Sequence, residues 1–178
     1  KIADLANLGV DQPVAETAFR ILGVIAAKEA CEVASKWVEA YTRDASPSRK
    51  FLIGLAIKYL SSKKATKLDR LIEIVENELI EIERGATPVK KQEPNAPAPK
   101  QARMDFTSPV PFLEHVIAEI GAHHDTSAGP ILRDVLAAPG LPARAEAAVA
   151  LGATRWRDGW GALADALDDA DPWVRLMA

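Results

Sequence analysis

The stretch that decides the fold runs from Ala143 to Arg175 and reads ARAEAAVALGATRWRDGWGALADALDDADPWVR. It opens with an alanine-rich segment that ends at Gly152, continues with the shorter segment GALADAL, and ends with Asp171, Pro172 and three further residues. An aspartate followed by proline is typical of a helix start, because the carboxylate accepts amide hydrogen bonds and proline has no amide to leave unpaired. The stretch therefore predicts two packed helices followed by the start of a third.

The same pattern recurs at a fixed offset along the chain, the one that separates Pro130 from Gly161. At this offset Pro130–Leu136 aligns with Gly161–Leu167, with matching leucines and a matching aspartate, and Val116–Ala122 aligns with Ala147–Ala153. A fixed period of about 20 to 50 residues is typical of stacked supersecondary units, since one such unit cannot bury its apolar face alone. We therefore expect partial repeats in the C-terminal part of the chain.

Residues 142–178 strongly resemble HEAT-like repeats of the phycobilisome-lyase type. Those repeats have an arginine-started, alanine-rich helix that ends Leu-Gly, then a shorter helix, then Asp-Pro-x-Val-Arg, as at 171–175 here. The resemblance is looser over 112–141, and over 1–85 only the rhythm of helix pairs is similar. It implies an all-α fold, an α-solenoid of antiparallel helix pairs in a right-handed HEAT-like superhelix, with the second helices lining its inner surface.

Apolar residues at three- and four-residue spacing predict helices in the N-terminal part as well. No segment alternates with a period of two, so we expect no sheet. The expected buried stripes are Val14, Ala18, Ile21, Leu22 and Ile25; Ala30, Ala34, Trp37, Val38 and Tyr41; Phe51, Leu52, Leu55, Ala56, Tyr59 and Leu60; and Leu68, Leu71, Ile72, Val75, Leu79 and Ile82.

Charge and proline content divide the chain into three parts. Residues 1–85 carry 13 basic and 13 acidic side chains, 86–108 carry four and two, and 109–178 carry five and ten, with no lysine. We predict an N-terminal HEAT-like helical module at 1–85, a proline-rich linker at 86–108 and C-terminal HEAT-like repeats at 109–178. The linker is expected to run extended, either as a mobile spacer or pinned to the helices by Phe106, Val110 and Phe112.

Composition narrows the classes of function. With 48% apolar residues the chain is no disordered tail, and its net charge of −3 provides no overall positive field for nucleic acid. Cys31 is the single cysteine, so neither an internal disulfide nor the usual zinc site is expected. No apolar run reaches the roughly 18 residues of a membrane span. We expect a cytoplasmic protein without cofactor, and Lys1 and the short last helix suggest a fragment of a longer one.

Three tryptophans are the first candidate for a contact surface. Trp156, Trp160 and Trp173 fall close together in sequence, beside Arg155 and Arg157. Tryptophan and arginine are favoured anchors at protein interfaces. The alternative is that these rings cap the end of the helix stack or pack under a turn.

Charged residues of the expected second helices are the next candidates for partner binding. Because those helices are expected to line the inner surface, their polar side chains would face a ligand there. The set suits a basic or mixed-charge ligand and comprises Arg133, Asp134, Asp165 and Asp168.

A basic patch lies between residues 49 and 70, where Asp69 is the one opposing charge. It suits phosphates or an acidic protein segment, and the alternative is a solvated face balanced by the glutamates at 73–83. Some HEAT-like proteins are DNA glycosylases, but residues 109–178 carry a net charge of −5, so nucleic acid is not the expected partner. Besides Arg70, the patch comprises Arg49, Lys50, Lys58, Lys63, Lys64 and Lys67.

Histidines and carboxylates gather between Glu114 and Asp125. His115, Glu119 and His123 stand at four-residue steps, a spacing that allows a metal site, although a solvated helix edge is the interpretation we favour. HEAT-like di-iron hydroxylases use His-Glu dipeptides, which this chain lacks. No nucleophile motif and no glycine-rich phosphate loop is present either, so we expect neither catalytic nor metal-binding residues.

We therefore predict a non-enzymatic scaffold or adaptor for protein–protein interaction, whose partner is another protein or a segment of the parent chain. One alternative is a subunit of a HEAT-like enzyme, such as a lyase that attaches a chromophore to a partner's cysteine. The other is a HEAT-like protein that binds nucleic acid through the basic patch.

Overall fold

The computed structural model describes residues 2–42, 45–85 and 112–178. Within these ranges every regular element is helical and no strand is present, which confirms the all-α prediction. The predicted linker at 86–108 lies outside the described residues, as do Phe106 and Val110. The elements are α1 (Ile2–Leu5), α2 (Gln12–Ile25), α3 (Ala27–Glu39), α4 (Pro47–Ser62), α5 (Leu68–Gly85), α6 (Phe112–Ala122), η1 (Thr126–Ala128), α7 (Gly129–Ala137), α8 (Arg144–Thr154), η2 (Arg157–Gly159), α9 (Trp160–Ala166) and α10 (Pro172–Met177).

Two of the helices, α4 and α10, begin after a side chain that caps them. The Asp171 carboxylate accepts a hydrogen bond of 2.9 Å from the Trp173 amide at the start of α10. The Ser46 hydroxyl accepts one of 3.4 Å from the Arg49 amide at the start of α4. In both places a proline follows the cap, where its missing amide costs no hydrogen bond.

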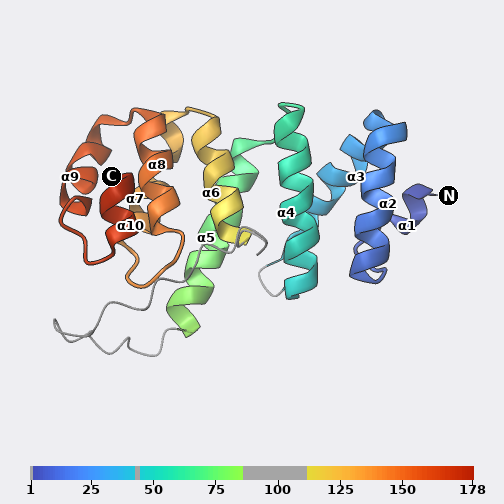
Figure 1. The fold of residues 1–178 in the computed structure, drawn as a ribbon, viewed down its shortest axis with the longest axis horizontal. Helices are drawn as coiled ribbons and strands as arrows, with labels where there is room; N and C mark the ends of the chain where they lie inside the picture. The colour runs from blue at the N-terminus through green and yellow to red at the C-terminus, as the bar shows by residue number, and fades with distance from the viewer. Residues whose placement is uncertain (1, 43–44, 86–111) are drawn as a thin grey trace.

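The helices form two rows, as Figure 1 shows. Helices α2, α4, α6, α8 and α10 lie side by side in one row, and α3, α5, α7 and α9 form the other. Neighbours in the chain pack across the rows, as α3 does on α4, α5 on α6 and α7 on α8. No helix in the described ranges has both the length and the apolar character needed to cross a membrane.

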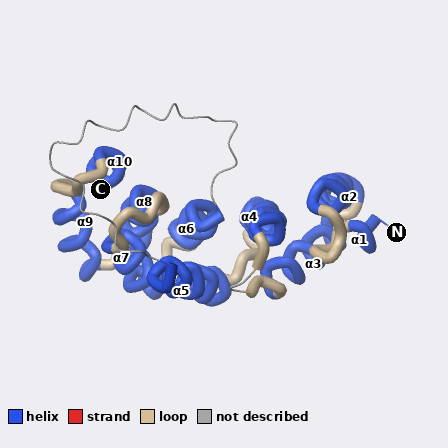
Figure 2. Tube along the Cα trace, turned by 90° about the horizontal axis from the view of Figure 1, so that it is seen from below, coloured by secondary structure: helices blue, strands red, loops and turns tan. Residues whose placement is uncertain are grey.

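The two rows follow a shallow bend, and Figure 2 shows the row of α2 to α10 on its inner side. Our expectation that the second helices line the inner surface is therefore wrong. A Cβ added to Gly121 of α6 would lie only 2.9 Å from the Cα and Cβ of Ala150 of α8. The inner-row helices α6 and α8 therefore approach closely.

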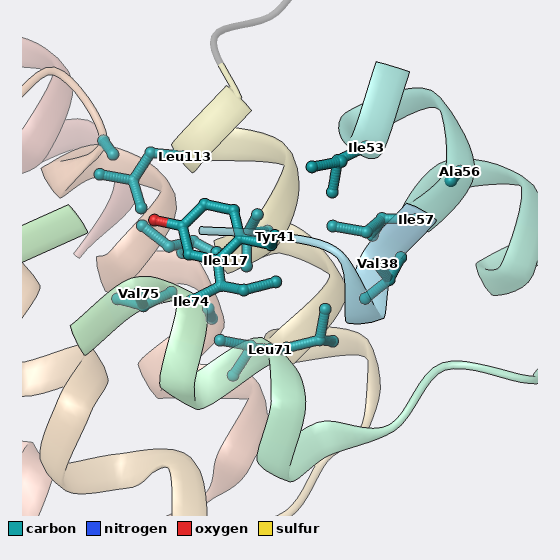
Figure 3. Close-up of a cluster of buried hydrophobic side chains, with 14 of the residues drawn as sticks. Val38, Tyr41, Ile53, Ala56, Ile57, Leu71, Ile74, Val75, Leu113 and Ile117 are labelled. Atoms are coloured by element: carbon teal, nitrogen blue, oxygen red, sulfur yellow. The ribbon is translucent and has the colours of Figure 1, made fainter. Parts of the chain in front are cut away.

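One apolar core runs through the described helices and joins residues on both sides of the predicted linker. Figure 3 shows side chains of α3, α4, α5 and α6 converging in it. The rings of Tyr41 and Phe112 stack there with centroids 5.9 Å apart. Phe112, one of the three residues expected to pin the linker, is thus the first residue of α6 and packs against this core. The division into modules at 85 and 109 stays a prediction.

The buried face of α2 differs from the predicted one. Ala18 and Leu22 are buried as expected, but Val14, Ile21 and Ile25 are exposed, at 42%, 45% and 64%. The reason is an aromatic contact, because the Phe19 ring lies 4.8 Å from the ring of Trp37 and 5.3 Å from that of Tyr59. These contacts direct the Phe19 face of the helix inward.

The sequence repeat is also present in the backbone. The order α6, η1, α7 is repeated as α8, η2, α9, and the first residues of the two short 3-10 helices, Thr126 and Arg157, are related by the repeat offset. His124 and Arg155 are related by the same offset, and both have left-handed backbone, with φ of 53° and 55°. Side chains other than glycine rarely adopt this conformation, so the two units share an unusual turn.

Candidate interaction surface

Large apolar side chains are exposed at the C-terminal end of the two rows. Trp160 opens α9 and is 65% exposed, and Trp173 lies in the first turn of α10 and is 49% exposed. Leu167 and Leu176 are 56% and 69% exposed. Exposed tryptophans of this kind are common anchors at interfaces. We refer to Trp160, Leu167, Trp173 and Leu176 together as the C-terminal apolar surface.

Trp156 has a different place from the other two candidate tryptophans. It is half-buried and packs against the core, where a Cβ added to Gly129 of α7 would overlap its ring. The Arg133 guanidinium lies 5.7 Å from the centroid of the indole. Trp156 therefore packs under a turn and links α7 to η2, which is the alternative that the sequence left open for it.

The four charged candidates lie in the outer row. Arg133 and Asp134 belong to α7, Asp165 belongs to α9, and Asp168 follows the end of α9. Arg133 forms an ion pair of 3.0 Å with Asp134, directly beside it in the chain. Asp165 and Asp168 are exposed, and no ion pair within the described part of the chain includes either. In sequence, Leu167 therefore lies between the carboxylates of Asp165 and Asp168, which have no ion-pair partner among the described residues.

A largely buried ion pair between Arg144 and Asp169 stabilises this end of the molecule. The Arg144 guanidinium binds the Asp169 carboxylate with both of its terminal nitrogens, and its Nε donates to the Leu136 carbonyl at 2.8 Å. Burial raises the pKa of Asp169, but the hydrogen bonds from Arg144 and from the Asp171 amide outweigh it and hold that pKa below its ordinary value. Arg144 therefore ties the start of α8 to the turn before α10.

The basic patch is not one cluster in the structure. Arg49 and Lys63 lie near opposite ends of α4, about 20 Å apart at the rise of an α-helix. Lys50 pairs with Glu78 at 2.6 Å, and Lys67 pairs with Glu39 at 3.2 Å. Their charges are partly neutralised within the fold.

Two further members of the patch have local roles. The Lys63 ammonium lies 5.7 Å from the Tyr59 ring centroid, and Lys64 has left-handed backbone with a φ of 53° after the end of α4. Lys58 is exposed and lowers the pKa of His115 together with burial, which is the larger cause. Arg49 and Lys58 are exposed on separate turns of α4, and Lys63 and Lys64 are exposed just after it.

The side chains of Glu119 and His123, considered above as parts of a metal site, both contact the hydroxyl group of Thr66. Thr66 Oγ1 donates to Glu119 Oε1 at 2.7 Å and lies 2.9 Å from His123 Nε2. In the described ranges no group of three or more His, Cys, Asp or Glu side chains is placed to hold a metal ion. His115 lies near Gly54 of α4, and no short-range sequence signal pointed to Thr66.

The comparisons with known proteins do not assign a class. No protein-family model, no curated protein and no solved structure matches this chain. The resemblance to HEAT-like repeats and the function that it implies therefore stay predictions.

Proposed function

We propose that this chain is a non-enzymatic scaffold for protein–protein interaction, built as an α-solenoid of HEAT-like helix pairs. The observation that carries the proposal is the exposure of Trp160 and Trp173 on adjacent units at one end of the helix rows. Burial of such rings against a partner removes large apolar areas from water, at roughly 25 cal/mol per Å². The partner is another protein or a segment of the parent chain, met in the cytoplasm.

The recurrence of one unit supports the solenoid part of the proposal. The units α6–η1–α7 and α8–η2–α9 have the same order of elements and the same left-handed residue at the end of the first helix. Units that contact mainly their neighbours build an extended surface, which is the property that repeat proteins use for binding.

The charges near α4 speak against the nucleic-acid alternative. Lys50 and Lys67 are paired with Glu78 and Glu39, and Arg49 and Lys58 lie on separate turns of α4, away from Lys63 and Lys64 at its end. Binding to phosphate backbones depends on several free cations close together, since each released counterion contributes to affinity. No observation favours the chromophore-lyase alternative over the scaffold.

The test is capture of a partner by the full-length parent protein, followed by measurement with the purified pair. The double variant Trp160→Ala/Trp173→Ala should weaken the purified complex by at least about tenfold, whereas Val24→Ser, at the opposite end of the row and 86% exposed, should leave its Kd unchanged. Mass spectrometry of the partner after incubation tests the enzyme alternative. A covalent mass change, or equal binding by the tryptophan double variant, would contradict the proposal.

A further inference from the structure

Three turns of the molecule each contain a basic residue with left-handed backbone. The φ angles are 53° for Lys64, 53° for His124 and 55° for Arg155, and these three are the non-glycine residues with positive φ among those that the structure describes. Each lies just after the end of an inner-row helix, α4, α6 or α8. A helix that ends in this conformation usually has glycine there, because a Cβ makes the conformation less favourable. In three successive units the chain therefore has a long basic side chain where glycine would be less strained.

Side-chain contacts hold these three turns together along one edge of the molecule. Thr66, in the turn between α4 and α5, has its Oγ1 atom 2.9 Å from Nε2 of His123, at the end of α6. His124 Nδ1 lies 3.2 Å from the carbonyl oxygen of Ala153, near the end of α8. Figure 1 shows the ends of α4, α6 and α8 next to one another at the top of the view. The three left-handed residues therefore follow one another along a continuous edge.

Four lysine and arginine side chains lie exposed along this edge. Lys63 and Lys64 belong to the first turn, and Arg155 and Arg157 belong to the third. Within the described ranges, no ion pair includes any of the four. An anion at this edge would therefore meet cations that the fold has not already neutralised.

The spacing of the turns indicates the kind of anion that fits. Helix α4 packs directly on α6, and α6 on α8, and packed helices lie about 8 to 10 Å apart. An extended peptide rises about 3.3 Å per residue, so a carboxylate at every third residue recurs at about 10 Å. One strand of double-stranded DNA carries a phosphate about every 3.4 Å, so most of its charges would meet no cation here. The exposed carboxylates of Asp125 and Asp158, in the second and third turns, would also repel it.

We propose that Lys63, Lys64, His124, Arg155 and Arg157, together called the basic edge, bind an extended acidic segment of the partner protein. This inference rests on the proposed scaffold function and specifies the chemistry of the partner. The acidic side chains of the segment pair with one turn after another. The left-handed residues are basic because glycine, although less strained, would provide no charge for the segment.

The experiment uses the full chain and two labelled peptides of about ten residues, long enough to span the three turns at about 3.3 Å per residue. One peptide has glutamate at every third position, the other has lysine there, and the remaining positions are the same. We expect the glutamate peptide to bind at least about tenfold more tightly, with an affinity that falls as salt is added. Fluorescence anisotropy gives the Kd. Equal binding of the two peptides, or binding of neither, would overturn the inference.

The triple variant Lys64→Gly/His124→Gly/Arg155→Gly separates binding from folding. It should weaken binding of the glutamate peptide by at least about tenfold. Because glycine relieves the left-handed backbone, the midpoint of thermal denaturation should stay equal or rise. Unchanged binding by this variant, or a lower midpoint, would overturn the inference, since the basic residues would then serve the fold or nothing at this edge.

Arg20→Gln/Arg49→Gln is the matched control, because it removes the same formal charge at pH 7, where His124 counts as neutral. Arg20 belongs to α2, and Arg49 lies at the start of α4, at the opposite end from Lys63. The control should leave the Kd of the glutamate peptide within about twofold of the natural chain. A loss equal to that of the triple variant would show that net charge, and not the basic edge, determines binding.

Nucleic acid is the competing ligand. A labelled DNA duplex that binds more tightly than the glutamate peptide at the same salt concentration would overturn the acidic segment as occupant, and weaker binding of the duplex supports it. None of these results would overturn the scaffold function, which is tested by the captured partner and the exposed tryptophans Trp160 and Trp173.

Discussion

Thr66 Oγ1 donates a hydrogen bond of 2.7 Å to Glu119 Oε1, 53 residues further along the chain. The bond joins the connection between α4 and α5 to the side of α6. The same hydroxyl lies 2.9 Å from His123 Nε2, and because its proton is directed at Glu119, it accepts from the imidazole N–H. A single side chain therefore links the two parts of the molecule that the predicted linker separates in sequence.

Thr66→Val should lower the free energy of unfolding by about 1 to 2 kcal/mol, because it leaves the partly buried carboxylate and imidazole without their shared partner. Thr66→Ser retains the hydroxyl and should cost clearly less. Urea denaturation of the two variants measures the difference. Equal stability of the valine variant and the natural chain would show that water replaces the hydroxyl without loss.

Gly121→Ala and Gly152→Ala should have opposite effects, although both replace a helical glycine at equivalent positions. The new methyl group at 121 would lie 2.9 Å from Ala150 and force α6 and α8 apart, at a cost of about 1 to 3 kcal/mol. At 152 nothing lies within 4 Å, so the gain in helix propensity should stabilise the chain by about 0.5 to 1 kcal/mol. Thermal and urea denaturation test both signs, and destabilisation by both variants would contradict the packing described for α6 and α8.

Trp156→Ala and Trp160→Ala separate the packing tryptophan from the exposed one. Trp156 fills the space over Gly129 and under Arg133, so its removal should cost about 3 kcal/mol of folding free energy. Trp160 is 65% exposed, and its removal should change stability by no more than about 0.5 kcal/mol. A large loss of stability in Trp160→Ala would mean that this ring serves the fold and not a partner.

Protonation of His115 should destabilise the fold. Burial, and to a smaller extent Lys58, lower the pKa of His115 below its ordinary value of 6.5. The unfolded chain therefore binds the proton more readily, so the stabilisation is complete above pH 6.5 and is lost as the pH falls from there through the lowered pKa. His115→Gln should flatten this part of the stability profile, which urea denaturation at a series of pH values measures.

Lys58→Met provides the control for the cause of that shift. Removing the cation should raise the pKa of His115 part of the way toward 6.5, because burial is the larger cause and persists. Titration of the imidazole by NMR measures the change. A lowered rather than raised pKa in the variant would contradict the position of Lys58 beside this histidine.

Local sequence patterns predicted the helices well, and the reason is physical. The caps at Ser46 and Asp171 involve residues two or three positions apart, so the sequence alone indicates them. The repeat is found by comparing one segment of the sequence with another, which also needs no tertiary structure. The buried faces predicted from apolar spacing were less reliable. On α2 two apolar registers overlap, and only the contacts of the Phe19 ring with the rings of Trp37 and Tyr59 decide which of them turns inward.

For the candidate interaction surface, too, the sequence indicated the residues, and the tertiary structure decided their roles. The three tryptophans stood out in sequence, but Trp156 and Trp160 differ in role because one meets Gly129 at the start of α7 and the other meets no covering helix among the described residues. The basic patch likewise resembled a cluster because its members are close in sequence, whereas α4 spreads them along its length and Glu39 and Glu78 pair with two of them.

By itself the sequence determined that the described residues are helical, that α10 begins at its Asp-Pro pair, and that the C-terminal units recur at one fixed period. These properties follow from interactions within about one turn or from repetition. Only the tertiary structure decided which apolar faces are covered, which charges are paired and which row lies inside the bend. Those outcomes depend on contacts between residues distant in sequence, such as Gly121 with Ala150, and no local pattern specifies them.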